Sequence, residues 1–182
     1  PILFLEYHRQ FTHSLIFIPV GALICSLLFH RWYKKTLTFK QGYLVCFLGY
    51  ATHGLLDACT TYGTLLLWPF SDMRIAWNNV SVVDPLFTIP ILVLVIITIL
   101  KANPAYSRVA LVWGLCYLLF GVLQRERAES QGWELAISRG HEPIRLEAKP
   151  GFGNLFLWKV VYEADDRFYV DGFRMAAEPT LF

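Results

Sequence analysis

Charged side chains are distributed very unevenly along this chain, and this asymmetry limits what it can fold into. Residues 1–123 carry only twelve of the 16 basic and 14 acidic side chains, and residues 124–182 carry the other eighteen. The first region is therefore too apolar and too poor in charge for an ordinary soluble domain. The pattern predicts a membrane-embedded domain over residues 1–123, followed by a small extramembrane domain over residues 124–182.

Four apolar stretches in the first region are candidates for membrane-spanning helices, at residues 14–29, 42–56, 82–100 and 109–123. A spanning helix needs about 20 residues, so three of these stretches require their flanks to cross the bilayer. We expect a mainly α-helical, polytopic transmembrane bundle with about four spans and a small C-terminal α+β domain.

Basic residues in the connecting segments indicate the orientation. Residues 30–40 and 101–108 carry Lys and Arg but no acidic residue, so the positive-inside rule places both in the cytoplasm. With alternating spans, the segment around His13, the 59–81 loop and the C-terminal domain then face the extracytoplasmic side.

The C-terminal region has the pattern of a small water-exposed domain. Residues 124–139 are typical of a helix that stops at Gly140. Residues 155–162 and 167–175 are rich in β-branched and aromatic residues and flank the turn-like sequence EADD, which predicts a hairpin.

Two classes of function are disfavoured by composition. The net charge of +2 is too small to indicate nucleic-acid binding. The four cysteines show no CxxC spacing and lie in or beside apolar segments. We therefore interpret them as small apolar residues of the helices rather than as a disulfide framework or a thiolate metal site.

His53 and Asp57 are the strongest sign of chemistry in the chain. Their i, i+4 spacing places both side chains on one face of a helix, where they can hold one cation together. Ionisable residues in a membrane segment are costly unless they have partners or a function. The competing interpretation is a hydrogen-bonded His–Asp pair that only ties two helices together.

His8 and His13 precede the first apolar stretch and would reach the same outer face. A spacing of five does not put both rings on one helical face, so either the backbone breaks between them or only one is a ligand. Histidine and aspartate are ligands typical of zinc. We therefore predict a divalent metal site, most plausibly zinc, with His8, His13, His53 and Asp57 as its ligands.

Other polar residues on the predicted outer face are candidates for supporting roles. Arg9 would stabilise developing negative charge, and Asp84 would orient a ligand or act as a base, unless Asp84 only caps a helix. Arg74 and Tyr62, in the 59–81 loop, would contact the substrate. For Arg74 the alternative is an interaction with lipid headgroups or with Asp72.

The order of these motifs resembles a known family. The segments YHRQFTHS (7–14), HGLLD (53–57), TYGT (61–64), LLWPFS (66–71) and DP (84–85) are similar to the YdjM-like family of membrane-bound, metal-dependent hydrolases. The resemblance runs from residue 6 to residue 88 and implies a helical protein of the bacterial inner membrane. The family's histidines and aspartate correspond to His8, His13, His53 and Asp57.

Two departures from the family pattern stand out. Gln10 occupies a position where family members commonly have glycine. Family members also have an upstream stretch that resembles Pro-Asp-Leu-Asp. Because this chain begins at Pro1 rather than at Met, we expect that such an N-terminal segment precedes it.

Together these features predict an integral-membrane hydrolase that cleaves an ester or a phosphoester, from a small molecule or a lipid, at the outer membrane face. Its expected partners are membrane lipids and the substrate, with no nucleic acid, and its oligomeric state is left open. The alternative is a non-catalytic transporter or scaffold. A transport pathway is disfavoured because polar residues do not continue to the cytoplasmic ends of the spans.

Overall fold

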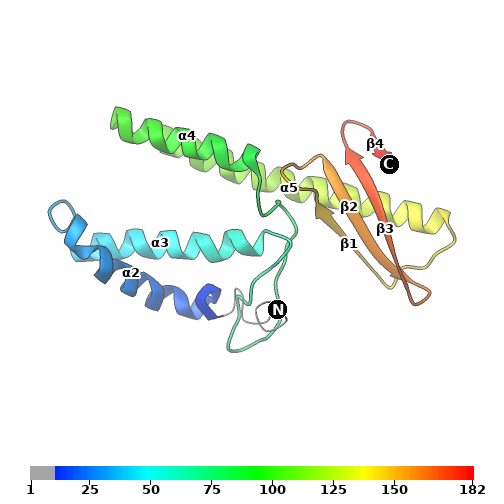
Figure 1. The fold of residues 1–182 in the computed structure, drawn as a ribbon, viewed down its shortest axis with the longest axis horizontal. Helices are drawn as coiled ribbons and strands as arrows, with labels where there is room; N and C mark the ends of the chain where they lie inside the picture. Colours follow the sequence, from blue (N-terminus) through cyan, green and yellow to red (C-terminus); the bar gives the residue numbers. More distant parts are fainter. Residues whose placement is uncertain (1–10) are drawn as a thin grey trace. The chain divides into compact units, whose positions relative to one another are not determined.

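The computed structural model describes residues 11–182, which belong to two compact units that divide between Trp77 and Asn78. The helical elements are η1 (Phe11–His13), η2 (Leu15–Phe17), α2 (Ile18–Tyr33), α3 (Phe39–Ala58), α4 (Pro85–Lys101) and α5 (Ala105–Ser138) (Figure 1). The strands are β1 (Arg145–Pro150), β2 (Leu157–Ala164), β3 (Arg167–Met175) and β4 (Pro179–Leu181).

The first unit is built on a hairpin of α2 and α3 (Figure 1). A Cβ atom on Gly21 would lie 2.6 Å from Cζ of Tyr50, so the absence of a side chain lets the tyrosine ring of α3 lie against α2. Thr38 and Gln41 form a capping box that fixes the start of α3 after the turn. This packing determines which residues of α3 lie beside the segment that precedes α2.

The loop after α3 folds back onto the same hairpin. The backbone of Thr64 exchanges hydrogen bonds with that of Ile75, at 2.9 and 2.8 Å, which closes the loop on itself. The N–H of Leu15 donates to the carbonyl of Leu66 at 2.9 Å. The loop thus holds the 3-10 turns that precede α2 in place.

The second unit contains the α4–α5 hairpin and the sheet. We expected the last span to end near residue 123 and a separate helix to follow, but α5 passes through this point as one helix of 34 residues. At 1.5 Å per residue it is about 51 Å long, which exceeds the thickness of a bilayer core. Its C-terminal half presents Ala128, Gly132 and Ala136 to the sheet, and a Cβ on Gly132 would meet the side chain of Val160.

The sheet is antiparallel, in the order β1-β2-β3-β4. The predicted hairpin is confirmed as β2 and β3, and its turn is at Asp165 and Asp166, both of which have positive φ. The sheet's inner face forms the core with α5, through Trp158, Val160 and other buried side chains. Strands β1 and β4, which extend the hairpin at its two edges, were not predicted.

A charged clamp fixes the end of α5 to the sheet. The guanidinium of Arg139 donates to both carboxylate oxygens of Asp171, at 2.7 and 2.8 Å, and to the hydroxyl of Tyr162 at 3.2 Å. These hydrogen bonds raise the pKa of Arg139 above its ordinary value. Gly140, with φ of 77°, ends the helix in the left-handed conformation, as predicted from the sequence.

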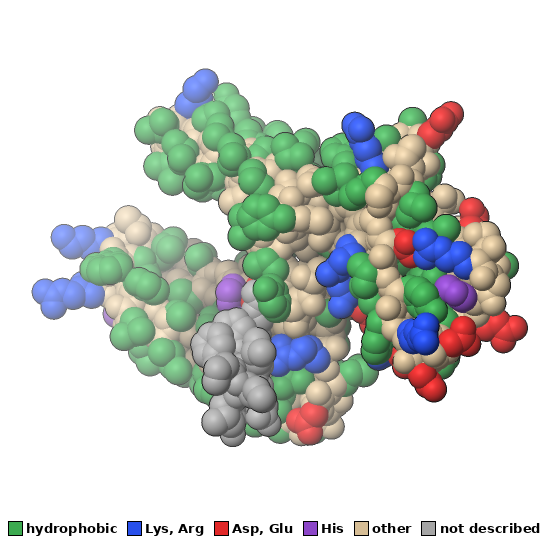
Figure 2. Space-filling model, turned by 45° about the vertical axis from the view of Figure 1, so that its right-hand side comes forward, with side chains coloured by type: hydrophobic (Ala, Val, Ile, Leu, Met, Phe, Trp, Pro, Cys, Tyr) green, Lys and Arg blue, Asp and Glu red, His purple; other side chains and the backbone are tan. Residues whose placement is uncertain are grey.

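Large hydrophobic side chains are exposed along α2, α3, α4 and the first half of α5, and Figure 2 shows such side chains gathered on the visible face. Among the described residues, Leu15–Tyr33 and Ala105–Ser138 are long and apolar enough to cross a membrane by length and composition. Pro85–Lys101 is apolar but shorter, and α3 is a fourth helix. The predicted mainly helical fold with a C-terminal sheet is therefore confirmed, whereas two helices rather than four meet this criterion for a span.

Candidate metal centre

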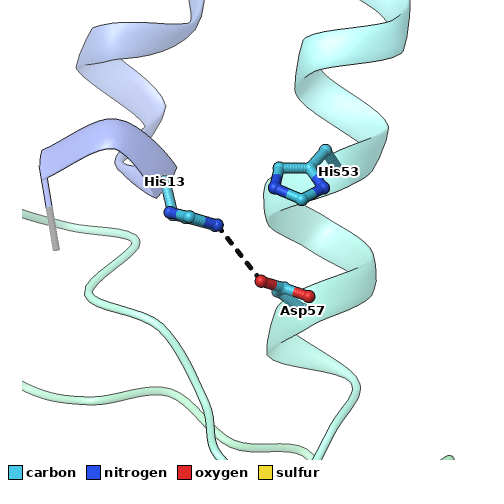
Figure 3. Close-up of side chains that lie close together, drawn as sticks. All are labelled: His13, His53 and Asp57. Carbon is cyan, nitrogen blue, oxygen red and sulfur yellow. Dashed lines mark ion pairs between the residues drawn. The ribbon is translucent and has the colours of Figure 1, made fainter. Parts of the chain in front are cut away.

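The last two turns of α3 carry the first two residues of the site. His53 and Asp57 lie one turn apart and project from the same side of the helix, as their spacing predicted (Figure 3). Asp57 is one residue from the last helical residue, Ala58. A carboxylate is disfavoured there, because the helix dipole has its negative end at the C-terminus. A nearby positive charge would relieve that cost.

His13 supplies the third residue from a different part of the chain. It is the last residue of η1, and a Cβ atom on Gly54 would lie only 3.0 Å from its carbonyl oxygen. Gly54 is buried in α3 between the two site residues of that helix. The missing side chain at Gly54 therefore allows η1 to approach α3 at the level of the site.

The three side chains form a compact cluster. One ligand atom from each of His13, His53 and Asp57 lies within 4.8 Å of the other two. Nε2 of His13 is 3.1 Å from Oδ2 of Asp57 (Figure 3), and the centroids of the two imidazole rings are 4.8 Å apart. The side chains of His13 and Asp57 are 15% and 19% exposed, whereas His53 is exposed, so the cluster is open to its surroundings on the side of His53.

Thr12 orients the ring of His13. Its Oγ1 atom lies 2.9 Å from Nδ1 of His13, a hydrogen-bonding distance, which leaves Nε2 to face Asp57. Hydrogen bonds of this kind commonly fix the ring orientation of metal-binding histidines.

Two imidazoles and one carboxylate are a donor set that suits zinc. Ligands bound tetrahedrally at 2.0–2.2 Å stand roughly 3.4 Å from one another. The 3.1 Å between His13 and Asp57 is near this value, whereas the group as a whole lies within 4.8 Å, so the side chains must draw closer to bind one ion. Three protein ligands with a further position for water or substrate are typical of catalytic rather than structural zinc sites. The donor set therefore fits the predicted ion.

Not all predicted site residues can be placed around this cluster. His8 and Arg9 lie outside the described residues 11–182. Arg74 directs its guanidinium to the loop backbone, where Nη1 donates to the carbonyls of Gly63 at 3.3 Å and Tyr62 at 3.5 Å. The ring of Tyr62 is exposed. The structure thus brings Arg74 and Tyr62 together, while their contact with a substrate stays a prediction.

Asp84 belongs to the second unit, where it is the N-cap of α4. Its Oδ1 atom accepts from the backbone N–H groups of Leu86 at 3.1 Å and Phe87 at 3.2 Å, and its Oδ2 atom accepts from the hydroxyl of Tyr117 at 2.9 Å. The residue is buried. These contacts agree with the capping role considered from the sequence, and a catalytic role for Asp84 stays a prediction.

Two residues of the site were not predicted from the sequence. Gly54 carried one usable signal, because glycine is disfavoured in a helix interior unless something packs closely there. Thr12 carried none, since a threonine next to a histidine is equally consistent with a helix cap.

The fold and the site define a class: a helical membrane protein with a cluster of two histidines and one carboxylate at the end of a helical hairpin. Residues 1–128 match the family described as YdjM inner membrane protein, and the chain belongs to this family, which confirms the predicted resemblance.

One relative is inner membrane protein YbcI of Escherichia coli (strain K12), which is 39% identical over 83 residues. The aligned region covers 41% of this chain and 44% of the relative, so the chain spans less than half of that relative's length. No solved structure matches the chain.

Proposed function

We propose that this inner membrane protein is a metal-dependent hydrolase whose ion is held by His13, His53 and Asp57, with His8 as a further ligand. One observation carries the proposal: two segments forty residues apart in the sequence bring two imidazoles and a carboxylate within 4.8 Å. A structural pair would need only His13 and Asp57. The third donor, His53, lies on the same side of α3 and extends the pair into a ligand set (Figure 3).

Zinc is the most plausible ion, and when bound it would lower the pKa of a water molecule and polarise the bond to be cleaved. The chain's own residues prepare this chemistry. Thr12 fixes the ring of His13, and Asp57 contributes the negative charge that a divalent cation requires. Arg9, two residues before Phe11, is proposed to stabilise negative charge that develops on the substrate.

The substrate class follows from where the site lies. The cluster is at the end of an apolar hairpin whose outer surface suits lipid, so a substrate would reach it at the depth of the headgroups. Esters and phosphoesters, including those of lipids, are present at that depth. We propose this class of substrate, which would contact Arg74 and Tyr62.

We also propose that α2, α3, α4 and α5 all span the membrane, with residues 30–40 and 101–108 in the cytoplasm and the C-terminus outside. The charge of these two connections supports this orientation. Alkaline phosphatase fused after residue 182 should be active in cells, and a fusion at residue 35 should be inactive. The opposite pattern would reverse the orientation.

Metal content of the purified full chain tests the site. In detergent, with zinc supplied and excess removed, the wild type should retain about one ion per chain, and His53→Ala and Asp57→Asn should lose most of it. The matched controls are His30→Ala, on α2, and Asp72→Asn, on the exposed loop; both should retain the ion. Equal zinc content in all five proteins would mean that the cluster binds no ion and that the His–Asp pair only ties two segments of the chain together. That result would defeat the proposal.

Activity is tested separately. Hydrolysis of p-nitrophenyl esters and phosphoesters presented in mixed micelles should depend on zinc, and should fall with the same variants that lose the ion. If zinc binds at the cluster but none of these substrates is cleaved, the hydrolase assignment fails for this substrate class while the metal site remains.

A further inference from the structure

The second unit contains an apolar cavity of about 330 Å³ that the proposed metal site does not use. Its walls are Leu86 of α4 together with Trp113 and Phe120 of α5, and it is closed on a third side by the loop between β1 and β2. The loop contributes Leu155, which is fully buried, and Phe156. The cavity therefore presents carbon surface to whatever occupies it.

The only hydroxyl in the cavity wall is already used. It belongs to Tyr117, which donates its hydroxyl hydrogen to Asp84 at 2.9 Å. The remaining wall residue, Cys116, has a small apolar side chain. A polar ligand would find no free partner in this cavity, so its occupant must be hydrocarbon.

The loop that closes the cavity is held in position. The N–H of Gly153 donates to Oγ of Ser81 at 3.3 Å, and Gly153 adopts a φ of 74°, which favours glycine. Phe156 packs edge-on against Phe120 of α5, with the ring centroids 6.3 Å apart. The cavity is thus part of the folded unit and not a gap between loosely placed side chains.

The position of the cavity along the membrane normal follows from the sequence of α5. Its apolar stretch ends at Leu123, and the next charged residue is Arg125. At 1.5 Å per residue, Phe120 lies about 7.5 Å from Arg125 along the helix and Trp113 about 18 Å from it. With α4 and α5 spanning the membrane as proposed above, the cavity extends from the level of the headgroups towards the middle of the bilayer, where acyl chains are the available hydrocarbon.

A cation lines a neighbouring hollow that shares Phe156 with this cavity. Phe156 also borders a second hollow, of about 580 Å³, which is lined by Asn154 and Arg174 among others. Arg174 is exposed on β3, and its guanidinium forms no hydrogen bond or ion pair with other residues in the range 11–182. Arginine recognises phosphate well, because its planar guanidinium can donate two parallel hydrogen bonds.

We propose that these two hollows form a binding site for one anionic phospholipid, with an acyl chain in the apolar cavity and the phosphate on Arg174. Phe156 separates the two parts, as the glycerol region separates the chain from the phosphate in the lipid. The site would anchor the sheet to the membrane surface beside α5. It is independent of the metal cluster, because all of its residues belong to the second unit.

Quenching of tryptophan fluorescence by brominated lipids tests this site, because Trp113 lines the cavity. The full chain is reconstituted in phosphatidylcholine vesicles that contain increasing fractions of phosphatidylglycerol with brominated acyl chains, or of brominated phosphatidylcholine as the neutral comparison. Trp113→Phe identifies the part of the signal that comes from the cavity.

Three variants complete the design. Arg174→Gln removes the proposed phosphate partner, and Lys159→Gln removes an exposed cation from the same face of the sheet that does not border either hollow. Cys116→Phe fills the cavity with a larger side chain. Circular dichroism and the gel-filtration profile establish that each variant remains folded.

The wild type should prefer phosphatidylglycerol over phosphatidylcholine, and Arg174→Gln should reduce this preference about fivefold, the effect of one cation near an anionic surface. Lys159→Gln should preserve the preference, and Cys116→Phe should reduce quenching of Trp113 by both lipids. Equal losses in the two charge variants would indicate a general surface field and overturn the proposal. A Trp113 signal that neither lipid quenches would mean that protein covers the cavity, which would also overturn it.

Discussion

The carbonyl oxygen of His13 lies so close to α3 that a Cβ atom on Gly54 would stand only 3.0 Å from it. This contact sets the distance between η1 and the helix that carries His53 and Asp57. A side chain at position 54 must push the two backbones apart, because neither partner in the contact is the flexible end of a side chain.

Gly54→Val should therefore weaken zinc binding by about tenfold or more, the loss typical of residues that position metal ligands. The measurement is a zinc titration of the purified chain. Gly49→Val is the matched control, because Gly49 lies on the same helix with no atom within 4 Å of its Cβ position, so its affinity should equal that of the wild type. Unchanged affinity in Gly54→Val would mean that the close approach is not what assembles the cluster.

Thr12→Val should reduce zinc affinity by roughly tenfold while leaving all three ligands in place, because the hydroxyl near Nδ1 of His13 no longer fixes the imidazole. The same zinc titration measures the effect. Thr52→Val is the control, because Thr52 is exposed and its hydroxyl donates only to carbonyls of its own helix, α3. If both variants bind zinc as the wild type does, the ring of His13 needs no such support.

The sequence was sufficient to predict that His13, His53 and Asp57 meet at this site, but not how closely. The i, i+4 spacing of His53 and Asp57 is a local property of a helix, and the alternation of spans placed His13 at the same end. The contact between Gly54 and His13 joins two segments that are not neighbours in the sequence. Its presence depends on how η1 lies against α3, which no local pattern encodes.

Asp84→Ala should destabilise the second unit by roughly 2–3 kcal/mol, since it removes the cap of α4 and leaves the hydroxyl of Tyr117 without its acceptor. Asp84→Asn should cost about 1 kcal/mol, because asparagine caps a helix nearly as well but cannot satisfy both partners with one carbonyl oxygen. Unfolding in mixed micelles measures both. If the alanine variant were as stable as the wild type, neither the helix cap nor the hydrogen bond from Tyr117 would stabilise the second unit.

The fold, like the site, was predicted from the sequence only where the pattern is local. Alternating β-branched and aromatic residues were enough to predict β2 and β3, and Gly140 correctly marked the end of α5. Strand β1 was missed because its sequence, RLEAKP, lacks β-branched and aromatic residues. The continuity of α5 could not be predicted from local pattern, because the change from apolar to charged residues at Arg125 marks a change of surroundings while the helix continues.

Gln124 is where this continuous helix is joined to the sheet, and its replacement provides the test of that connection. It is buried, its Nε2 atom donates to the carbonyls of Leu155 at 3.1 Å and Met175 at 2.9 Å, and its Oε1 atom accepts from Arg127 at 2.7 Å. Gln124→Leu would remove the amide donor from the carbonyl of Met175 and leave the carbonyl of Leu155 with only the indole N–H of Trp158, at 2.8 Å. It would also take away the acceptor of Arg127, and the total cost should be about 2 kcal/mol.

Unfolding of the purified chain, followed by the circular dichroism of the sheet, should show this loss. Gln131→Leu on the same helix is the control, because the amide of Gln131 bonds only Glu134 at the surface, and its effect should stay within about 0.5 kcal/mol. If the two variants were equally stable, the small residues Ala128, Gly132 and Ala136 would be enough to hold the sheet on α5, and the buried amide would contribute nothing to that attachment.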